Sequence, residues 1–474
     1  MVERKSKVKC EDREYAGNLP RVSIIITFFN EYKSVLLRTL HSVVNRTSPE
    51  LLKEIILVDD FSDTDFLDKP LNEYVAAHFT NVRILRMLKH SGRSHARMLG
   101  ARSATAPVLV FMDSHIEVGD NWLPPLLEPI MLNNRTVMCP IIDRINEQTL
   151  RYQKVVGGRG AFDWNLNYSE LPRLPEDMKY PSEPFKNPIM KGELFAIFSK
   201  FFWKLKGYDN GFNEYGGEQF ELSFKIWMCD GEIYDAPCSR VAHIEANYRK
   251  EDDAESKPQK FILRNYKRVA EVWMGYYKKY LFQNNIKYSR ISTGDLTKQK
   301  AVRSKCKSFE WYLDTVAFDT KKKYPPSLFK YAEGAIQNMG NSNFCVDTLS
   351  RQVRSTIGVS SCAENLASPH EQQFWSIGWT QDLRTSDDEI CLDVPMRKIN
   401  ARVKLWKCHG QGGNQHWIYD IKTKLLRNGS HGKRCLEMLP HNMHLVVNKC
   451  NETKQYMKWI FGFTNRTALE NMLT

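Results

Sequence analysis

Val108-Leu-Val-Phe-Met-Asp-Ser-His115 joins a short apolar run to two side chains that can bind a metal. A continuous apolar run of this length is typical of a strand buried on both faces of a parallel sheet. Residues two positions apart on a strand point the same way, so Asp113 and His115 would converge where the strand ends. A carboxylate with an imidazole suits a divalent transition metal such as Mn2+. The alternative is that Asp113 caps the following segment and His115 is an ordinary loop residue.

Strand and helix patterns alternate on the N-terminal side of this stretch. Buried strands are predicted at Arg21–Phe29, Glu54–Val58 and Val82–Leu88, with helices near Ser34–Val44 and Ser94–Ala104. Such alternation implies a parallel sheet with helices on its faces. Ligands bind beyond the carboxyl ends of the strands, where Thr27, Asp60 and Asp113 would gather along one rim. The sequence therefore predicts a nucleotide site there, with a helix N-cap as the alternative role for Asp60.

Length and composition indicate a globular chain of two or three domains. The 474 residues are too many for one ordinary domain, and 42% hydrophobic residues are ample for packed cores. The formal net charge is +13, but lysine and arginine are spread along the chain without an arginine-rich arm or a zinc finger. We therefore expect solubility and attraction for an anionic ligand, and no nucleic-acid binding.

The last third of the chain, from about Asn343, contains an internal repeat. Cys345-Val-Asp, Cys391-Leu-Asp and Cys435-Leu-Glu recur at intervals of 46 and 44 residues, and the cysteines that follow them are Cys362, Cys408 and Cys450. Gln373-Phe-Trp375 and Gln415-His-Trp417 supply the Gln-x-Trp signature of a ricin-type trefoil. A threefold repeat with one cysteine pair in each unit predicts that all-β fold.

Cysteine pairs and glycosylation sequons together favour an oxidising secretory compartment. The sequons begin at Asn45, Asn134, Asn167, Asn428, Asn451 and Asn465. No segment approaches the roughly 18 apolar residues that span a bilayer, and the first residues, Met1-Val-Glu-Arg-Lys-Ser-Lys7, lack the apolar core of a signal peptide. A targeting segment is therefore expected to be missing from this chain or never to have existed.

Several segments carry a resemblance to one known family. They are residues 22–31 (Val-Ser-Ile-Ile-Ile-Thr-Phe-Phe-Asn-Glu), 53–60, 113–115, 160–166, 215–227 and 238–243. In register from Cys10 onward, they resemble the polypeptide N-acetylgalactosaminyltransferases. The resemblance implies an α/β GT-A nucleotide-sugar transferase domain with a Rossmann-like sheet, joined to an all-β ricin-type β-trefoil lectin domain. It also implies a retaining enzyme that moves GalNAc from UDP-GalNAc to Ser or Thr of a polypeptide and so initiates mucin-type O-glycosylation.

The resemblance also implies roles for individual residues. Asp113, His115 and His243 would bind Mn2+, with Asp113 and Glu218 as catalytic residues. The donor-binding residues would be Thr27, Asp60, His90, Ser114 and Tyr215. Glu218 would lie near the sugar, and capping of the following helix is its alternative role.

The chain departs from the family pattern around the donor. Glu193 stands where the family usually has a glycine that lets the donor sugar approach. His90 and His95 stand where arginines are usual, and Ala246 replaces an arginine whose role Arg249 would have to assume. Because charged phosphate contacts are strong, their combined weakening leaves a second hypothesis open. In that hypothesis the chain is a weak or inactive relative that binds glycopeptides or regulates other proteins.

The three trefoil lobes differ as expected sugar sites. The family pattern needs an Asp after the first cysteine and an Asn in Gly-Gly-Asn-Gln, and the middle lobe keeps both as Asp393 and Asn414, with His409 to stack on the sugar. We expect GalNAc to bind there and the other two lobes to be mainly structural. The alternative is that Asp393 merely stabilises a turn.

The resemblance further implies disulfides, domain limits and location. The expected disulfides are Cys10–Cys238, Cys229–Cys306, Cys345–Cys362, Cys391–Cys408 and Cys435–Cys450, which leave Cys139 as a buried free thiol. The expected parts are an N-terminal segment (1–19), the GT-A catalytic domain (20–319), a linker (320–342), the lectin domain (343–464) and a tail (465–474). Family members lie in the Golgi lumen behind an N-terminal membrane anchor that this chain does not show, and their partners are UDP-GalNAc and peptide or GalNAc-glycopeptide acceptors.

Overall fold

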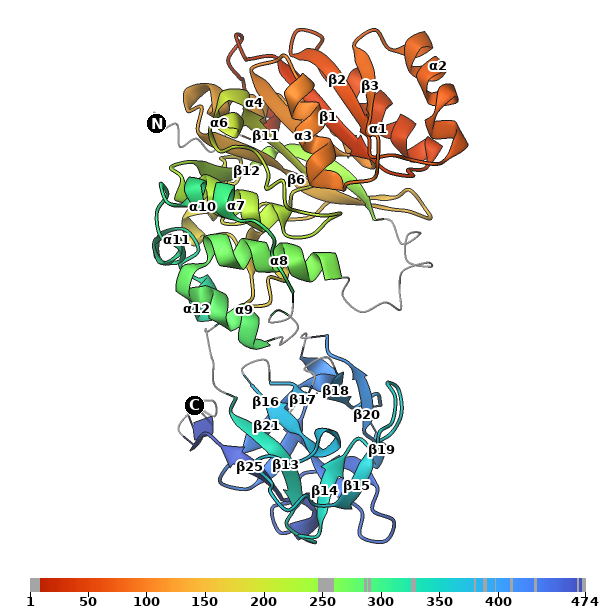
Figure 1. Cartoon of the computed structure of the whole chain (residues 1–474), viewed down its shortest axis with the longest axis vertical. Helices are drawn as coiled ribbons and strands as arrows, with labels where there is room; N and C mark the ends of the chain where they lie inside the picture. Colours follow the sequence, from red (N-terminus) through yellow and green to blue (C-terminus); the bar gives the residue numbers. More distant parts are fainter. Residues whose placement is uncertain are drawn as a thin grey trace. The chain divides into compact units, whose positions relative to one another are not determined.

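The computed structural model describes residues 9–245, 260–284, 288, 291–324, 330–378, 381–386, 390–396, 398–409, 412–429, 433–466 and 469–470. The chain divides into two compact units after Tyr324. Figure 1 draws the first unit in red to green and the second in blue. Each unit has its own hydrophobic core, so each is described by itself.

The first unit is built on one large mixed sheet. Its main strands are β1 (Val22–Phe28), β2 (Leu52–Asp59), β3 (Val82–Arg86), β4 (Val108–Asp113), β6 (Thr136–Asn146), β10 (Phe185–Lys186), β11 (Leu194–Phe198) and β12 (Glu232–Glu245), in the order β10-β12-β6-β11-β4-β1-β2-β3. The four strands predicted before residue 115 are all present and parallel. Beyond them β11 runs antiparallel to both β4 and β6. The sheet is therefore mixed: it is parallel over the part that the alternating pattern predicts and again between β6 and β12, with the antiparallel β11 between these two parts.

The central strands are apolar throughout because both of their faces are covered. Along β4, Leu109 and Phe111 belong to one core cluster, whereas Val110 and Met112 belong to another. The first cluster includes residues of α3 (Arg93–Ser103) and α7 (Glu218–Met228), and the second includes residues of α1 (Lys33–Asn45), α2 (Lys69–His78) and α4 (Pro124–Leu132). Helices thus cover both faces of the sheet (Figure 1), and the polar side chains fall where the strands end.

The remaining elements complete the first unit. They are the short strands β5 (Ile116–Val118), β7 (Tyr152–Gln153), β8 (Arg159–Phe162) and β9 (Tyr168–Leu171), and the helices α5 (Pro175–Met178), α6 (Ser199–Lys204), α8 (Lys260–Trp273), α9 (Lys278–Asn284), α10 (Thr297–Arg303), α11 (Phe309–Thr315) and α12 (Thr320–Lys323). Among the described residues, no helix is both long enough and apolar enough to cross a membrane.

The second unit is the predicted β-trefoil. Its strands are β13 (Ala332–Asn338), β14 (Phe344–Asp347), β15 (Gly358–Ser361), β16 (Trp375–Ile377), β17 (Leu383–Thr385), β18 (Ile390–Asp393), β19 (Ala401–Arg402), β20 (Lys404–Lys407), β21 (Trp417–Asp420), β22 (Leu425–Asn428), β23 (Arg434–Met438), β24 (Leu445–Lys449) and β25 (Trp459–Thr464). One tryptophan in each lobe donates its indole N–H to a strand carbonyl in the same way: Trp375 to Val346, Trp417 to Leu392 and Trp459 to Leu436. The third lobe therefore keeps the buried tryptophan although its sequence lacks the Gln-x-Trp signature.

The predicted linker needs one correction. Within residues 320–342, β13 pairs with β14, β16 and β25 of the trefoil, so the lectin unit begins before Asn343. The sequence around Pro325 is polar and rich in proline, so β13 was not predicted. This strand pairs with three other segments of the trefoil. The two prolines at 325 and 326 lie outside the described residues.

The structure contains the five expected disulfides, and Cys139 is buried and free. Cys10–Cys238 ties the N-terminal segment to β12, the strand that also carries His243. Each trefoil lobe has its own disulfide, which compensates for a small core. Five disulfides in one chain are expected of a protein that folds in an oxidising compartment.

Candidate metal and nucleotide-sugar site

Asp113, His115 and His243 form a cluster with one potential ligand atom from each residue, and these atoms all lie within 4.8 Å of one another. The sheet places them together. Asp113 is the last residue of β4, while His243 on β12 pairs with Ile116 of β5, next to His115. The two imidazole rings meet edge to face, with centroids 4.5 Å apart. The three residues predicted from the sequence are therefore neighbours, although 128 positions separate His115 from His243 in the chain.

Two arginines on α3 control the charge of Asp113. Arg97, which is fully buried, donates from Nη2 to Asp113 Oδ1 over 2.9 Å, and Arg93 Nη1 lies 3.7 Å from Asp113 Oδ2. Burial raises the pKa of Asp113, but Arg93 and Arg97 outweigh it and hold that pKa at about 2. Asp113 is therefore ionised at neutral pH, as a metal ligand must be.

Glu31 orients the first histidine of the cluster. Its Oε2 lies 2.9 Å from His115 Nδ1 and accepts a hydrogen bond from Ser114 Oγ over 2.6 Å. A carboxylate on one ring nitrogen fixes a ligand histidine and leaves its other nitrogen for the metal. Ser114 was predicted to contact the donor, but its hydroxyl is buried and bound to Glu31. Burial also lowers the pKa of His243, which favours the neutral ring that binds metals.

The cluster fits Mn2+ in the chemical type of its ligand atoms and in the charge and orientation that these ligands already have. One carboxylate and two imidazoles are a suitable donor set for a divalent transition metal. Asp113 already carries its charge, and His115 is already oriented by Glu31. In known metal sites, side chains around the ligands also hold those ligands in orientation before the metal binds.

Thr27 and Asp60, which are predicted to bind the donor, lie on the same rim as Asp113. Thr27 of β1 lies in register with Asp113 of β4, and Asp60 directly follows β2. Asp60 does not cap the segment after it. Its carboxylate accepts hydrogen bonds from the backbone N–H groups of Ser91 and Gly92, over 2.9 and 2.7 Å. It thus anchors the loop that leads into α3, and burial raises its pKa.

His90 lies on this loop between two carboxylates and an aromatic ring. Its Nδ1 is 3.0 Å from Asp60 Oδ2, its Nε2 contacts Glu214, and its ring stacks on Phe29 with centroids 4.0 Å apart. Burial lowers the pKa of His90, but Asp60 and Glu214 more than offset that effect and leave the pKa raised. The imidazole of His90 is therefore protonated more readily than an ordinary histidine.

Glu218 and Tyr215 belong to the segment that leads into α7. Glu218 is the buried first residue of α7, and the helix cap is Gly217 with φ +93°, so Glu218 is not the cap. Its Oε1 lies 3.7 Å from Arg93 Nη1, and the same nitrogen is 3.7 Å from Asp113. Arg93 thus links Glu218 to the cluster. Tyr215 is half exposed and packs edge-on against Phe261.

Three residues of this site were missed from the sequence: Glu31, Arg93 and Arg97. Glu31 ends a segment that carries the family resemblance, which is the one signal that pointed to it. Arg93 and Arg97 are four positions apart on α3 and therefore share a helix face, but the sequence does not say which face meets Asp113. The departures at Ala246 and Arg249 lie outside the described residues.

Comparison with known proteins agrees with this geometry. The family model described as Glycosyl transferase family 2 matches residues 23–206, and the model described as Ricin-type beta-trefoil lectin domain matches residues 332–459. The chain is 53% identical to N-acetylgalactosaminyltransferase 6 of Drosophila melanogaster, covering 98% of this chain and 70% of that protein. It is 43% identical to Polypeptide N-acetylgalactosaminyltransferase 10 of Homo sapiens, covering 97% and 77%.

The chain belongs to the polypeptide N-acetylgalactosaminyltransferase family. A solved structure of GalNAc-T7 with UDP, GalNAc and Mn2+ is 31% identical, has a TM-score of 0.70, and covers 95% of this chain and 83% of that one. The match confirms the predicted fold class for this transferase, a GT-A domain and a ricin-type trefoil.

The middle lobe of the transferase's trefoil brings its three predicted residues together. Asp393 Oδ2 accepts hydrogen bonds from Asn414 over 2.7 Å and from Gln415 over 3.0 Å. His409 Nε2 lies 3.3 Å from Asn414 Oδ1. The three predicted residues are therefore in contact, with Asp393 buried below an exposed histidine and asparagine. Asp393 thus holds Asn414 in place within the short 3-10 turn Gly413–Gln415, and its role toward a sugar stays a prediction.

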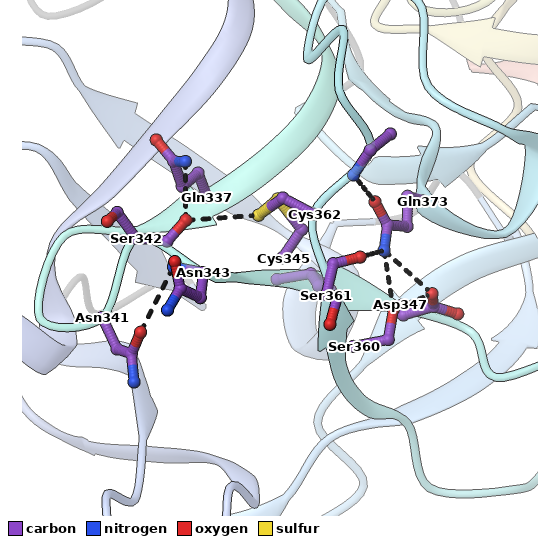
Figure 2. The surroundings of a disulfide bond; sticks show 12 residues. Gln337, Asn341, Ser342, Asn343, Cys345, Asp347, Ser360, Ser361, Cys362 and Gln373 are labelled. Carbon is purple, nitrogen blue, oxygen red and sulfur yellow. Dashed lines mark hydrogen bonds between the residues drawn. A yellow bond between two sulfur atoms is a disulfide. The ribbon is translucent and has the colours of Figure 1, made fainter.

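The other two lobes use their acidic residues internally. In the first lobe, Figure 2 shows Asp347 beside the Cys345–Cys362 disulfide, where it binds Ser360 and Gln373. In the third lobe, Glu437 accepts hydrogen bonds from Asn448 over 2.7 Å and Lys454 over 3.0 Å. The mainly structural role of these two lobes stays a prediction, because Asp393 of the middle lobe also binds a glutamine of its own lobe.

Proposed function

We propose that this chain transfers GalNAc from UDP-GalNAc to Ser and Thr hydroxyls of polypeptides with Mn2+ as cofactor. The observation that carries the proposal is the Asp113–His115–His243 cluster at the rim where Thr27 and Asp60 end their strands. Relatives named as N-acetylgalactosaminyltransferases, which match 97–98% of this chain and 70–77% of their own length, support it. So does the solved relative described with UDP, GalNAc and Mn2+.

The residues around the cluster divide the work of catalysis. Bound Mn2+ would supply a Lewis acid that neutralises charge developing on the departing diphosphate. Arg97 and Arg93 keep Asp113 ionised, and Glu31 holds His115 in its orientation. Arg93 adds a fixed positive charge between Asp113 and Glu218. In the retaining reaction of this family, the acceptor hydroxyl attacks from the face that UDP leaves. Because Arg93 links Glu218 to the metal cluster, Glu218 is proposed to contact the sugar.

A transfer assay tests this function. Purified chain is incubated with UDP-GalNAc, Mn2+ and a panel of Thr-containing peptides and GalNAc-glycopeptides, and products are read by mass spectrometry with an active family member as control. The proposal predicts addition of one N-acetylhexosamine to peptide hydroxyls. If the control is active but no peptide or glycopeptide is modified, the hypothesis of an inactive glycopeptide-binding relative replaces the enzyme.

Replacing Asp393 with alanine is expected to weaken GalNAc-glycopeptide binding by about tenfold or more, because a buried carboxylate that positions Asn414 and faces the sugar is removed. Binding is measured by calorimetry with a GalNAc-Thr peptide. The matched control is Asp347→Ala in the first lobe, whose carboxylate binds Ser360 and Gln373, and which should leave glycopeptide affinity unchanged. Equal affinities for the Asp393 variant and the unaltered chain would contradict the assignment.

The location proposed for the chain is the Golgi lumen. The five disulfides support an oxidising compartment of the secretory pathway. Initiation of mucin-type O-glycosylation would take place on polypeptides passing through that compartment.

A further inference from the structure

Glu193 lies directly across the sheet from the metal ligand Asp113. The backbone N–H of Asp113 donates to the Glu193 carbonyl over 3.0 Å, and the next pair in the antiparallel register is Met112 with Leu194. Directly opposed residues of antiparallel strands point to the same face, with Cβ atoms about 5 Å apart. The side chain of Glu193 therefore projects beside the metal cluster.

The carboxylate of Glu193 is left with an unfilled hydrogen-bonding position. Its Oε2 is buried and has no hydrogen-bond partner. Its charge is close enough to His243 to oppose the burial that lowers the pKa of that ring, yet Glu193 is not among the residues whose ligand atoms cluster within 4.8 Å. It is thus a neighbour of the metal site and not a fourth member of it. A buried acceptor without a partner is destabilising, and a ligand that donates a hydrogen bond to it would offset that cost.

Glu193 also faces open space. Together with His243, Gln219 and Lys191, it lines a pocket of about 890 Å³. The other carboxylates of this pocket are already engaged: Glu170 lies 2.7 Å from Lys191, and Asp143 accepts hydrogen bonds from Arg240 and Tyr152. Among the described residues that line the pocket, Glu193 is therefore the carboxylate that remains to receive a ligand.

The order of strands indicates which part of a nucleotide sugar reaches Glu193. Along the edge of the sheet, Asp60 directly after β2 and Thr27 of β1 come first, Asp113 of β4 follows, and Glu193 precedes β11. The family resemblance implies that Thr27 and Asp60 contact uridine and that the metal cluster holds the diphosphate, and the sugar would then lie on the side of Glu193. Sugar hydroxyls are the hydrogen-bond donors that a carboxylate acceptor requires.

We propose that Glu193 is a specificity-determining residue that accepts a hydrogen bond from a hydroxyl group of the donor sugar. The inference rests on the proposed function, because it takes the nucleotide sugar as the ligand of this rim. Glu193 then adds to the affinity for UDP-GalNAc and nothing to the affinity for UDP, since UDP ends at the diphosphate.

Calorimetry in the presence of Mn2+ tests this role with two ligands, UDP and UDP-GalNAc. Glu193→Ala is expected to reduce the preference for UDP-GalNAc over UDP by about tenfold, which is the usual worth of a hydrogen bond to a charged group. Glu193→Gln keeps the shape and one acceptor, and should lose less. Glu170→Ala removes a carboxylate that Lys191 already binds, so it should leave the preference unchanged.

The outcomes separate this inference from the function on which it rests. An unchanged preference in Glu193→Ala, while UDP still binds with Mn2+, would overturn the role of Glu193 alone. A rise in UDP-GalNAc affinity in that variant would also overturn it, because Glu193 would then occupy the space of the sugar. Failure of the unaltered chain to bind either nucleotide would contradict the proposed function itself.

Discussion

Replacing His243 with alanine is expected to lower Mn2+-dependent GalNAc transfer at least about 100-fold. Loss of a residue that only orients a metal ligand typically costs 10- to 100-fold in affinity or activity, and His243 is proposed as a ligand itself. Its ring packs edge-on against His115 at the rim of the unit, so the substitution removes little from the core. The measurement is the initial rate of transfer at saturating peptide and fixed Mn2+.

The control for this variant is His78→Ala, which removes an exposed histidine at the end of α2. That variant should transfer GalNAc at the unaltered rate. Circular dichroism establishes that both variants are folded. If His243→Ala is folded and keeps more than about a tenth of the activity at the same Mn2+ concentration, His243 is not a metal ligand.

Arg97→Met is expected to destabilise the chain by about 3–5 kcal/mol. The buried guanidinium binds Asp113 over 2.9 Å, the Gly192 carbonyl over 2.7 Å and the Tyr208 hydroxyl over 3.1 Å. Removing the directly hydrogen-bonded partner of a buried ion pair is the costly case, and Arg93, at 3.7 Å from Asp113, compensates the remaining charge only in part. Methionine fills much of the same volume, so the loss comes mainly from the weaker compensation of Asp113. The free energy of unfolding is measured by urea denaturation at pH 7.

A matched substitution on the same helix isolates the effect of burial. Arg102→Met changes an exposed residue of α3 and should alter the free energy of unfolding by no more than about 0.5 kcal/mol. A loss below about 1 kcal/mol for Arg97→Met would contradict a stabilising role for the buried Arg97–Asp113 pair.

The Arg97 effect should also depend on pH with a defined sign. The pKa of Asp113 is depressed to about 2 in the folded chain. The stability linked to its ionisation is therefore fully present above the ordinary carboxyl pKa of about 4 and is lost as the pH falls toward about 2. The difference in unfolding free energy between the unaltered chain and Arg97→Met should shrink over that interval.

Part of the fold and site could be predicted from the sequence because the signals are local. The run Val108–Met112 is apolar throughout, since both faces of β4 are covered, and that pattern is visible without a structure. The polar residues at the ends of β1, β2 and β4 then fall on one rim by the geometry of parallel strands alone. In the trefoil, the repeated cysteine pairs allow the threefold repeat to be predicted from the sequence.

The rest depends on contacts between distant segments. Arg97 pairs with Asp113 because of how α3 packs on the sheet, and the sequences of α3 and β4 do not predict that packing. Glu31 meets His115 across 84 positions of chain. β13 forms only by pairing within the trefoil, so a polar stretch that reads as a linker contains a strand. Trp459 completes the third lobe without the glutamine that marks the other two.

The Mn2+ dependence of UDP affinity tests the central claim most directly. Calorimetric titration of UDP is carried out with Mn2+ and again with EDTA, on the unaltered chain and on His243→Ala. The Asp113–His115–His243 cluster predicts tight UDP binding with Mn2+, a loss of at least about tenfold with EDTA, and a similar loss in the variant when Mn2+ is present. Equal UDP affinity under all these conditions would contradict a metal-held nucleotide at this rim.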